Sequence, residues 1–393
     1  MGLGVVLVFS ASATLDEPLI TRPLWRCGPV RQLAFVGAGF AAAVVASMLP
    51  YQWWRIRDRV DGHRWFQPNV LVFVLTVTLL VLVLIPGIGI ERNASRRWLG
   101  VGGSGTGLTF QPSELAKLSL VLFLAGWYGR RGVEAGRFGR GLLVPTTAIA
   151  VCAGLVGLED FGTAALLMVV GGLLLLAAGS RLWHLMLLTL PATSAMGYLL
   201  ISKPYRMARL TGFLHIWDDP GGKGYQAVQS LCSIGTGGWW GTGLGAGLQK
   251  YGYLPEARTD FIFGILCEEL GIAGGLVVIG LFVMFVWQGR KSASAAPDMF
   301  GRLLGLGVTL TVGLQAAMNI AVATVSVPTK GIALPLVSAG GSGVLFLGAS
   351  IGLLASVARA GAAWRDWMQI RHGLMTGLIE SVPASEMAVA GHG

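Results

Sequence analysis

Long apolar segments alternate with short polar segments along most of this 393-residue chain. An α-helix rises about 1.5 Å per residue, so about 20 apolar residues span the roughly 30 Å hydrocarbon core of a bilayer. Because lipid offers the backbone no hydrogen-bond partners, the pattern predicts an all-α integral membrane protein, a polytopic bundle of about ten transmembrane helices. The apolar segments occupy residues 2–13, 32–50, 67–88, 112–128, 141–158, 161–179, 182–201, 261–288, 301–325 and 332–358.

The first apolar segment is shorter than the others, and its length is compatible with two interpretations. Twelve residues of helix reach only about 18 Å. A cleaved signal peptide is one interpretation, because Ser10-Ala-Ser-Ala13 resembles a cleavage site, but the segment lacks a basic n-region. We expect instead the outer half of a truncated first helix, whose native beginning lies upstream of Met1.

Composition supports the membrane assignment and narrows the partners. Hydrophobic residues make up 54% of the chain and charged residues only 12%, a ratio that excludes an ordinary soluble domain. The net charge of +10 does not indicate nucleic acid, because basic residues are scattered singly and in pairs between apolar segments. Anionic headgroups or a phosphorylated lipid substrate suit this distribution better. The four cysteines have no metal-ligand spacing and predict no metal site or disulfide framework.

Basic residues in the short loops predict the topology. An even number of helices leaves both termini on one side, and short loops rich in arginine and lysine stay in the cytoplasm. The long loop between the seventh and eighth helices, about residues 202–260, is then extracytoplasmic. We expect residues 1–360 to form one transmembrane domain and residues 361–393 a cytoplasmic tail. The short-loop residues are Arg55, Arg57, Arg59, Arg64, Arg130, Arg131, Arg137, Arg140, Arg290 and Lys291.

The end of the long loop carries the strongest candidate for chemistry. Asp260 lies where this polar loop gives way to an apolar helix, and a carboxylate at such a boundary is costly to ionise. Lys250, Glu256 and Arg258 precede it on the polar side. An acidic residue favoured by the helix dipole is the plain structural interpretation of Asp260. That interpretation does not explain Glu268 and Glu269, about two turns into the same apolar helix.

Two further acidic positions allow both a structural and a functional interpretation. In Gln111-Pro-Ser-Glu-Leu-Ala-Lys117, Glu114 and Lys117 are three residues apart and share a helical face. They could form an ion pair that braces the bundle, or Lys117, like Arg97 in the preceding loop, could contact a lipid phosphate. Asp160 precedes the sixth apolar segment, where we favour a helix cap over a role in the site.

Glycine-rich segments in the outer loops could bind phosphate. Residues 221–230, which include Gln229, and residues 235–247 are rich in glycine, and such backbone can direct consecutive N–H groups at phosphate oxygens. Flexible loop is the alternative, and neither segment has the spacing of a P-loop. The loop 328–342 contains Lys330, a candidate phosphate contact, and Ser338.

Several of these segments together resemble one known family. Leu254-Pro-Glu-Ala-Arg-Thr-Asp-Phe-Ile-Phe263 followed by Glu268-Glu-Leu-Gly271 resembles the signature of the SEDS family (shape, elongation, division and sporulation) of membrane glycosyltransferases. Gln249-Lys-Tyr-Gly-Tyr253 and Lys330 are more similar to the members that act in division than to those that act in elongation. The chain departs from the family pattern at Ala94, Ser95, Glu159, Ala339 and Gly343. Further matches, in family order, are residues 111–117, 160–163, 224–230, 328–331 and 338–342.

The resemblance implies an activity and roles for individual residues. Such a protein is an inverting peptidoglycan glycosyltransferase of the bacterial cytoplasmic membrane. It transfers glycan from an undecaprenyl-pyrophosphate donor to the 4-hydroxyl of lipid II during cell division, with Asp260 as the general base. The implied substrate-binding residues are Arg97, Lys117, Gln229, Lys250, Glu256, Arg258, Lys330 and Ser338, and the supporting residues are Glu114, Asp160, Glu268 and Glu269.

The implied partners are a single-span class B penicillin-binding protein and other division proteins. No cofactor is implied with certainty, although a divalent cation is possible. Two other classes of function remain open: a lipid II flippase, which would also carry intramembrane charges such as Lys117 and Glu268, and a non-catalytic division scaffold.

Overall fold

The computed structural model describes residues 2–11, 28–55, 67–92, 95–101, 108–130, 135–202 and 204–381. Each of the ten apolar segments forms a helix within these residues, which confirms the all-α membrane class. These helices are α1 (Gly2–Ala11), α2 (Gly28–Met48), α3 (Pro68–Leu84), α4 (Pro112–Tyr128), α5 (Val144–Glu159), α6 (Phe161–Ala177), α7 (Leu182–Ile201), α10 (Ile262–Ser294), α11 (Met299–Ala323) and α12 (Ser342–Ser381).

Length and composition show that several of these helices suit a bilayer. Among the described residues, five helices are long and apolar enough to cross a membrane: α2, α5, α10, α11 and α12. Helices α3 and α6 are apolar but contain 17 residues each. The protein is therefore a multi-pass membrane protein.

Helix α4 forms the centre of the bundle. It packs against α3, α5, α6, α11 and α12. Ala116, Leu120, Leu124 and Ala125 on α4 are at most 1% exposed. Burial on all sides fits the sequence of α4, whose apolar residues are not confined to one face. Helix α4 is therefore a fixed support for any side chain at its ends.

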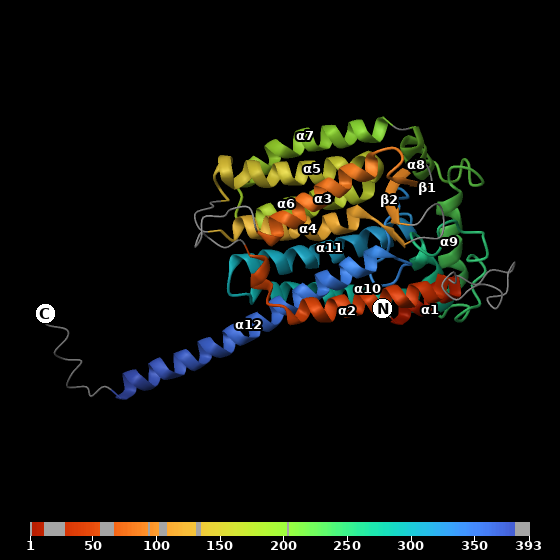
Figure 1. Cartoon of the computed structure of the whole chain (residues 1–393). Helices are drawn as coiled ribbons and strands as arrows, with labels where there is room; N and C mark the ends of the chain where they lie inside the picture. The colour runs from red at the N-terminus through yellow and green to blue at the C-terminus, as the bar shows by residue number, and fades with distance from the viewer. Residues whose placement is uncertain are drawn as a thin grey trace.

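Short elements cap one end of the bundle (Figure 1). There, the chain between α3 and α4 forms a three-stranded antiparallel sheet in the order β1-β2-β3. Leu99 of the middle strand pairs with Phe110 of the third. The sheet matters because β2 carries Arg97. The elements at this end are β1 (Ile90–Arg92), β2 (Ser95–Val101), β3 (Leu108–Phe110), α8 (Pro204–Leu214) and α9 (Tyr225–Gly237).

The opposite end gathers the short loops. Arg55 forms an ion pair with Asp298, at 3.5 Å, and donates a hydrogen bond to the Gly129 carbonyl oxygen. The loops after α2, α4 and α10 therefore meet, and α12 extends beyond the bundle on this side (Figure 1). The remaining turns here are a 3-10 helix, Tyr51–Trp54, and a π-helix, Phe138–Leu143. Four of the arginines that predicted the topology lie outside the described residues: Arg57, Arg59, Arg64 and Arg131.

The last apolar segment, residues 332–358, is longer than the part of it that is helical. Helix α12 starts at Ser342, at the end of the loop 328–342 that the sequence indicated. Pro335 has no N–H donor for a helical hydrogen bond, and Leu336 adopts a left-handed φ of 65°. Residues 332–341 instead form a loop, mostly buried, at the end of the bundle that carries the sheet.

Helix α10 is interrupted at Gly271, where φ is 73° and ψ is 179°. The backbone of residues 238–243 fills the interruption. Thr242 N–H donates to the Glu268 carbonyl oxygen (2.9 Å), and Ile272 N–H donates to that of Gly238 (2.9 Å). The glycine-rich segment after α9 is therefore an ordered part of the fold that is hydrogen-bonded to α10.

Gly271→Ala is expected to lower the free energy of unfolding by about 1–3 kcal/mol from backbone strain alone, because this region of φ and ψ is accessible almost only to glycine. A Cβ there would also overlap the Trp239 carbonyl. Thermal unfolding in detergent measures the effect. Gly280→Ala on the same helix is the control, since its Cβ would meet nothing within 4 Å. Equal midpoints for the two variants would contradict this account of the interruption.

Candidate active site

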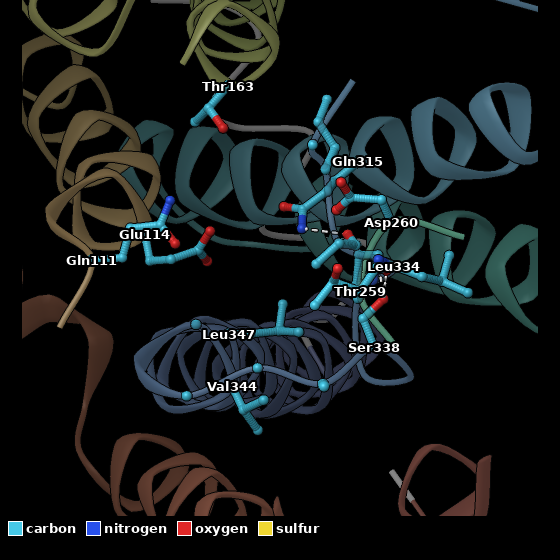
Figure 2. A pocket seen from close by; sticks show the side chains of 18 of the residues that line it. Gln111, Glu114, Thr163, Thr259, Asp260, Gln315, Leu334, Ser338, Val344 and Leu347 are labelled. Carbon is cyan, nitrogen blue, oxygen red and sulfur yellow. Dashed lines mark hydrogen bonds between the residues drawn. The ribbon is translucent and has the colours of Figure 1, made fainter. Parts of the chain in front are cut away.

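A cavity of about 850 Å³ opens at the end of the bundle that carries the sheet. Its walls come from α4, α11, α12 and the loops 255–260 and 331–341. Figure 2 shows Glu114 and Asp260 on facing sides of this space. Its apolar lining includes Val121, Val312 and Leu347. Its charged and amide side chains are Arg97, Gln111, Glu114, Lys117, Arg209, Gln226, Glu256, Arg258, Asp260 and Gln315, with Arg31 and Gln32 from α2.

Asp260 lies directly before α10, in a turn held by the backbone. Its N–H donates to the Glu256 carbonyl oxygen (3.1 Å), and its own carbonyl oxygen accepts from Asn319 Nδ2 (2.8 Å). A Cβ added at Gly331 would lie 3.3 Å from Asp260 Oδ2 and 3.6 Å from an Arg97 nitrogen. The carboxylate therefore sits against Gly331, close to the Arg97 guanidinium.

Burial sets the protonation of Asp260. It raises the pKa of this carboxyl to about 7, with a further increase from the charge of Glu256. Arg209 and Arg97 oppose the increase. Desolvation outweighs the effect of these two arginines. A pKa near the working pH is the property that an efficient general base requires.

Arg97 is held at the edge of the cavity by the start of α6. Its guanidinium donates to the Glu159 carbonyl oxygen at 2.6 and 3.1 Å and lies 3.4 Å from Asp160. Asp160 caps α6 by accepting from Thr163 N–H (3.1 Å) and Thr163 Oγ1 (2.9 Å). Asp160 thus serves both as the expected cap and as the partner of Arg97.

Glu114 and Lys117 form an ion pair of 2.8 Å that faces the cavity. The Lys117 ammonium also donates to Gln315 Oε1 (2.7 Å). Pro112 at the first turn of α4 and the fully helical run after it fix this geometry. The pair braces α4 against α11 and exposes charge to the cavity, so both interpretations from the sequence remain.

Lys330 and Ser338 lie on the loop between α11 and α12. The Lys330 ammonium lies 5.0 Å from the centre of the Phe161 ring, and burial lowers its pKa while Asp160 raises it. Ser338 Oγ donates to the Thr259 carbonyl oxygen (2.6 Å) and accepts from Leu334 N–H (2.7 Å). Ser338 lines the cavity, but its hydroxyl is used to join two loops.

Other candidates lie outside the cavity. Lys250 pairs with Glu269 at 2.8 Å, with both side chains at most 1% exposed, and Ser10 Oγ accepts from Lys250 (2.8 Å). Glu268 accepts from the N–H groups of Leu248 (2.7 Å) and Gln249 (3.2 Å). These contacts fasten the loop 245–250 onto α1 and α10. Gln229 is half-buried on α9 and does not line the cavity.

The sequence analysis gave no role in the site to several polar residues that line the cavity: Arg31, Gln32, Gln111, Arg209, Gln226 and Gln315. Gln226 lies one helical turn before Gln229, the residue that the sequence indicated. Gln315 had the clearest signal, since a polar side chain within a membrane helix is costly and often functional. Among the described residues, no three His, Cys, Asp or Glu side chains are grouped to hold a metal ion.

The protein is a multi-pass membrane protein whose helices surround a cavity. The cavity holds several cations and a carboxyl group with a pKa of about 7, an arrangement that suits acid–base chemistry on a charged substrate. The model of the FtsW/RodA/SpoVE family, described as cell cycle protein, matches residues 1–362. The chain belongs to this family, which confirms the resemblance to the SEDS signature.

Curated relatives and solved structures agree. The probable peptidoglycan glycosyltransferase FtsW of Thioalkalivibrio sulfidiphilus is 42% identical over 91% of this chain and 86% of the relative. Stage V sporulation protein E of Bacillus subtilis is 38% identical over 91% of this chain and 93% of the relative.

A chain from a peptidoglycan synthase complex, described as coordinating polymerization and crosslinking, has a TM-score of 0.69 and 26% identity, covering 92% of this chain and 95% of its own. RodA of Thermus thermophilus has a TM-score of 0.62 and 26% identity, and the match covers 91% of this chain and 92% of RodA.

Proposed function

We propose that this protein is a peptidoglycan glycosyltransferase that polymerises glycan strands during cell division. Several relatives at about 40% identity carry the name probable peptidoglycan glycosyltransferase FtsW. The observation that carries the proposal is the Asp260 carboxyl, which lines a cavity together with several cations and whose pKa burial raises to about 7, the property of a general base.

The reaction takes glycan from an undecaprenyl-pyrophosphate donor to the 4-hydroxyl of lipid II. The acceptor oxygen bonds to the anomeric carbon of the donor while the bond from that carbon to the pyrophosphate oxygen breaks. Asp260 accepts the hydroxyl proton during the attack and later releases it to solvent. Inversion needs no covalent intermediate, as in inverting glycosidases. Pyrophosphate leaves as a stable anion and needs no general acid, so one base is sufficient here.

Cations of the cavity stabilise the leaving pyrophosphate. Negative charge develops on the phosphate oxygens as the glycosidic bond breaks, and positioned positive charges lower the energy of that state. Arg97, Arg209 and Arg258 line the cavity with Asp260, and Lys117 lies in the same space beside Glu114. The apolar wall formed by α4, α11 and α12 suits the prenyl chain.

The cavity favours an enzyme over the flippase. Its charges gather near one end of the bundle, whereas a transporter needs a path through it. Glu268, the deep carboxylate that kept the transporter interpretation open, accepts hydrogen bonds from the loop backbone outside the cavity. The purified protein with lipid II as its only substrate tests the function. We expect polymeric glycan, and transbilayer movement of lipid II without polymer would favour the flippase.

The rate should rise with pH through about 7, because the protonated Asp260 carboxyl cannot accept a proton and its pKa is raised to about 7. Below that pH the rate should fall about tenfold per unit. Glu256→Gln removes a charge that raises this pKa, so its profile should shift to lower pH. Initial rates measured from about pH 5.5 to about pH 8.5 check both profiles, and a flat wild-type profile would contradict the assignment.

We also propose that the apolar helices lie in the bacterial cytoplasmic membrane in the ten-helix topology predicted from the sequence, with both termini in the cytoplasm. Helix α1, with 10 residues, crosses only part of the hydrocarbon core. Residues 1–360 then form the transmembrane domain and 361–393 the tail, with the loop 202–260 outside. The meeting of the short arginine-containing loops around Arg55 supports this orientation.

Cysteine labelling from outside the cell tests the orientation in a background whose native cysteines are serine. A cysteine at Gly221, exposed in the long loop, should react with a membrane-impermeant maleimide. A cysteine at Lys291, exposed at the opposite end, should react only after the membrane is opened. The reverse pattern would invert the topology.

The partner would be a class B penicillin-binding protein with a single membrane span, together with other division proteins. The similarity to a chain of a peptidoglycan synthase complex that couples polymerization to crosslinking supports this proposal. A divalent cation remains possible as a further ligand of the pyrophosphate.

A further inference from the structure

Helix α11 carries two amide side chains, Gln315 and Asn319, on one face. They are four residues apart, which places them one above the other on the helix. Gln315 is 8% exposed and Asn319 is fully buried. A buried amide is costly unless its polar atoms are hydrogen-bonded, so the partners of these two side chains indicate what they do.

Asn319 joins the turn that carries Asp260 to the loop that follows α11. Asn319 Nδ2 donates to the Asp260 carbonyl oxygen at 2.8 Å and to the Ile332 carbonyl oxygen at 2.7 Å. Both hydrogens of the amide are thereby used. Its Oδ1 is buried and has no hydrogen-bond partner among the described residues. The two bonds that Asn319 donates offset this cost, because they satisfy the carbonyl oxygens of Asp260 and Ile332.

Gln315 continues this network to the other side of the cavity. Its Nε2 donates to the Ala333 carbonyl oxygen (2.9 Å), next to the carbonyl that Asn319 holds. Its Oε1 accepts from Lys117, whose ammonium is paired with Glu114. Figure 2 shows Gln315 beside Asp260 and Glu114 across the cavity from them. Glu114 is therefore linked to the backbone of Asp260 by two sets of hydrogen bonds, which the peptide backbone of residues 332–333 joins.

The segment held by the two amides forms the wall behind the Asp260 carboxylate. Gly331, directly before Ile332, is the residue whose added Cβ would lie 3.3 Å from Asp260 Oδ2. Beyond it, Ser338 ties the same loop to Thr259, and Ala339 N–H donates to the Arg258 carbonyl oxygen (2.8 Å). A shift of residues 331–333 would therefore move the surroundings of the carboxylate.

We propose that Asn319 and Gln315 are positioning residues of the glycosyltransferase reaction. By fixing the backbone of residues 331–333 and of Asp260, they hold the carboxylate in place relative to Arg97 and to the Lys117–Glu114 pair. This inference rests on the proposed function, because it assigns the amides a role in turnover. Neither amide exchanges a proton with the substrate. They act through Asp260, and a misplacement of about 1 Å costs on the order of 10²-fold in rate.

The test compares Asn319→Leu and Gln315→Met with a matched control in the full chain, purified and supplied with lipid II. Both variants keep the side-chain volume while removing the hydrogen bonds. Thr309→Val is the control, since Thr309 is equally buried on α11, bonds only to its own helix at the Gly305 carbonyl oxygen, and does not line the cavity.

We expect kcat, per folded protein, to fall about 10- to 100-fold in both amide variants, with KM little changed. The unfolding midpoint should fall only moderately, because the carbonyl oxygens of residues 260, 332 and 333 lose their donors. Hydrogen exchange of the backbone at residues 331–334 should become faster in both variants and stay unchanged in Thr309→Val. A kcat equal to the wild-type value overturns the proposal, as does a loss of rate that only follows a loss of folded protein. Unchanged exchange at 331–334 also overturns it, even for an inactive enzyme. Absence of polymer with the wild-type protein would refute the proposed function, while the exchange measurement would still test the positioning of the loop.

Discussion

Lys250→Met is expected to lower the free energy of unfolding by about 3–5 kcal/mol, one of the largest stability effects available in this chain. Glu269 would keep its charge at a fully buried side chain and lose the ammonium 2.8 Å away. The desolvation cost of an unpaired buried charge then falls on the folded state. Thermal or denaturant unfolding in detergent measures the change.

Two further variants test whether the loss of stability comes from the buried Lys250–Glu269 ion pair. Lys250→Met combined with Glu269→Gln should recover a large part of the loss, because no buried charge remains. Lys291→Met changes an exposed lysine and should alter stability by less than about 0.5 kcal/mol. If Lys250→Met instead folded with wild-type stability and lost lipid II binding, Lys250 would be the substrate contact that the sequence indicated.

The helices were predictable because the pattern of apolar residues is long and continuous. The predicted segment 112–128 coincides with α4, and 182–201 with α7. The apolar segment 332–358 extends beyond its helix for a physical reason. Ile332, Leu334 and Val337 are apolar because they are buried in a loop, and an apolar sequence does not distinguish a buried loop from a helix.

The site was predictable only where its chemistry is local in sequence. Glu114 and Lys117 are three residues apart, so their pairing follows from helix geometry. Lys250 and Glu269 are 19 residues apart and meet through the folding of a loop onto α10, which no local pattern specifies. The choice between Gln226 and Gln229 depends on how α9 is rotated against the bundle, and packing alone decides it.

Asp260→Asn is expected to lower the rate of polymerisation by about 10²–10⁴-fold. The substitution keeps the size of the side chain and removes the group that accepts the proton. Folding should survive, because the bonds that hold this turn use the backbone: the N–H to Glu256 and the carbonyl oxygen to Asn319. Loss of a partly buried carboxyl that prefers to be neutral should not destabilise the protein.

Asp219→Asn is the matched control for this variant. It makes the same chemical change at an exposed carboxylate of the long loop, outside the cavity, and should polymerise at the wild-type rate. Glu268→Gln tests a different point, because Glu268 holds the loop backbone. It should lower stability together with rate, whereas Asp260→Asn should lower rate alone.

The most direct test of the central claim measures binding and turnover on the same sample of purified Asp260→Asn protein. Labelled lipid II retained by the folded protein reports binding, and glycan strands resolved by length report turnover. We predict that lipid II is bound nearly as well as by the wild type while polymer is almost absent, since a base acts mainly in the transition state. Polymer formed at the wild-type rate by a normally folded Asp260→Asn variant would contradict the assignment of Asp260 as the general base.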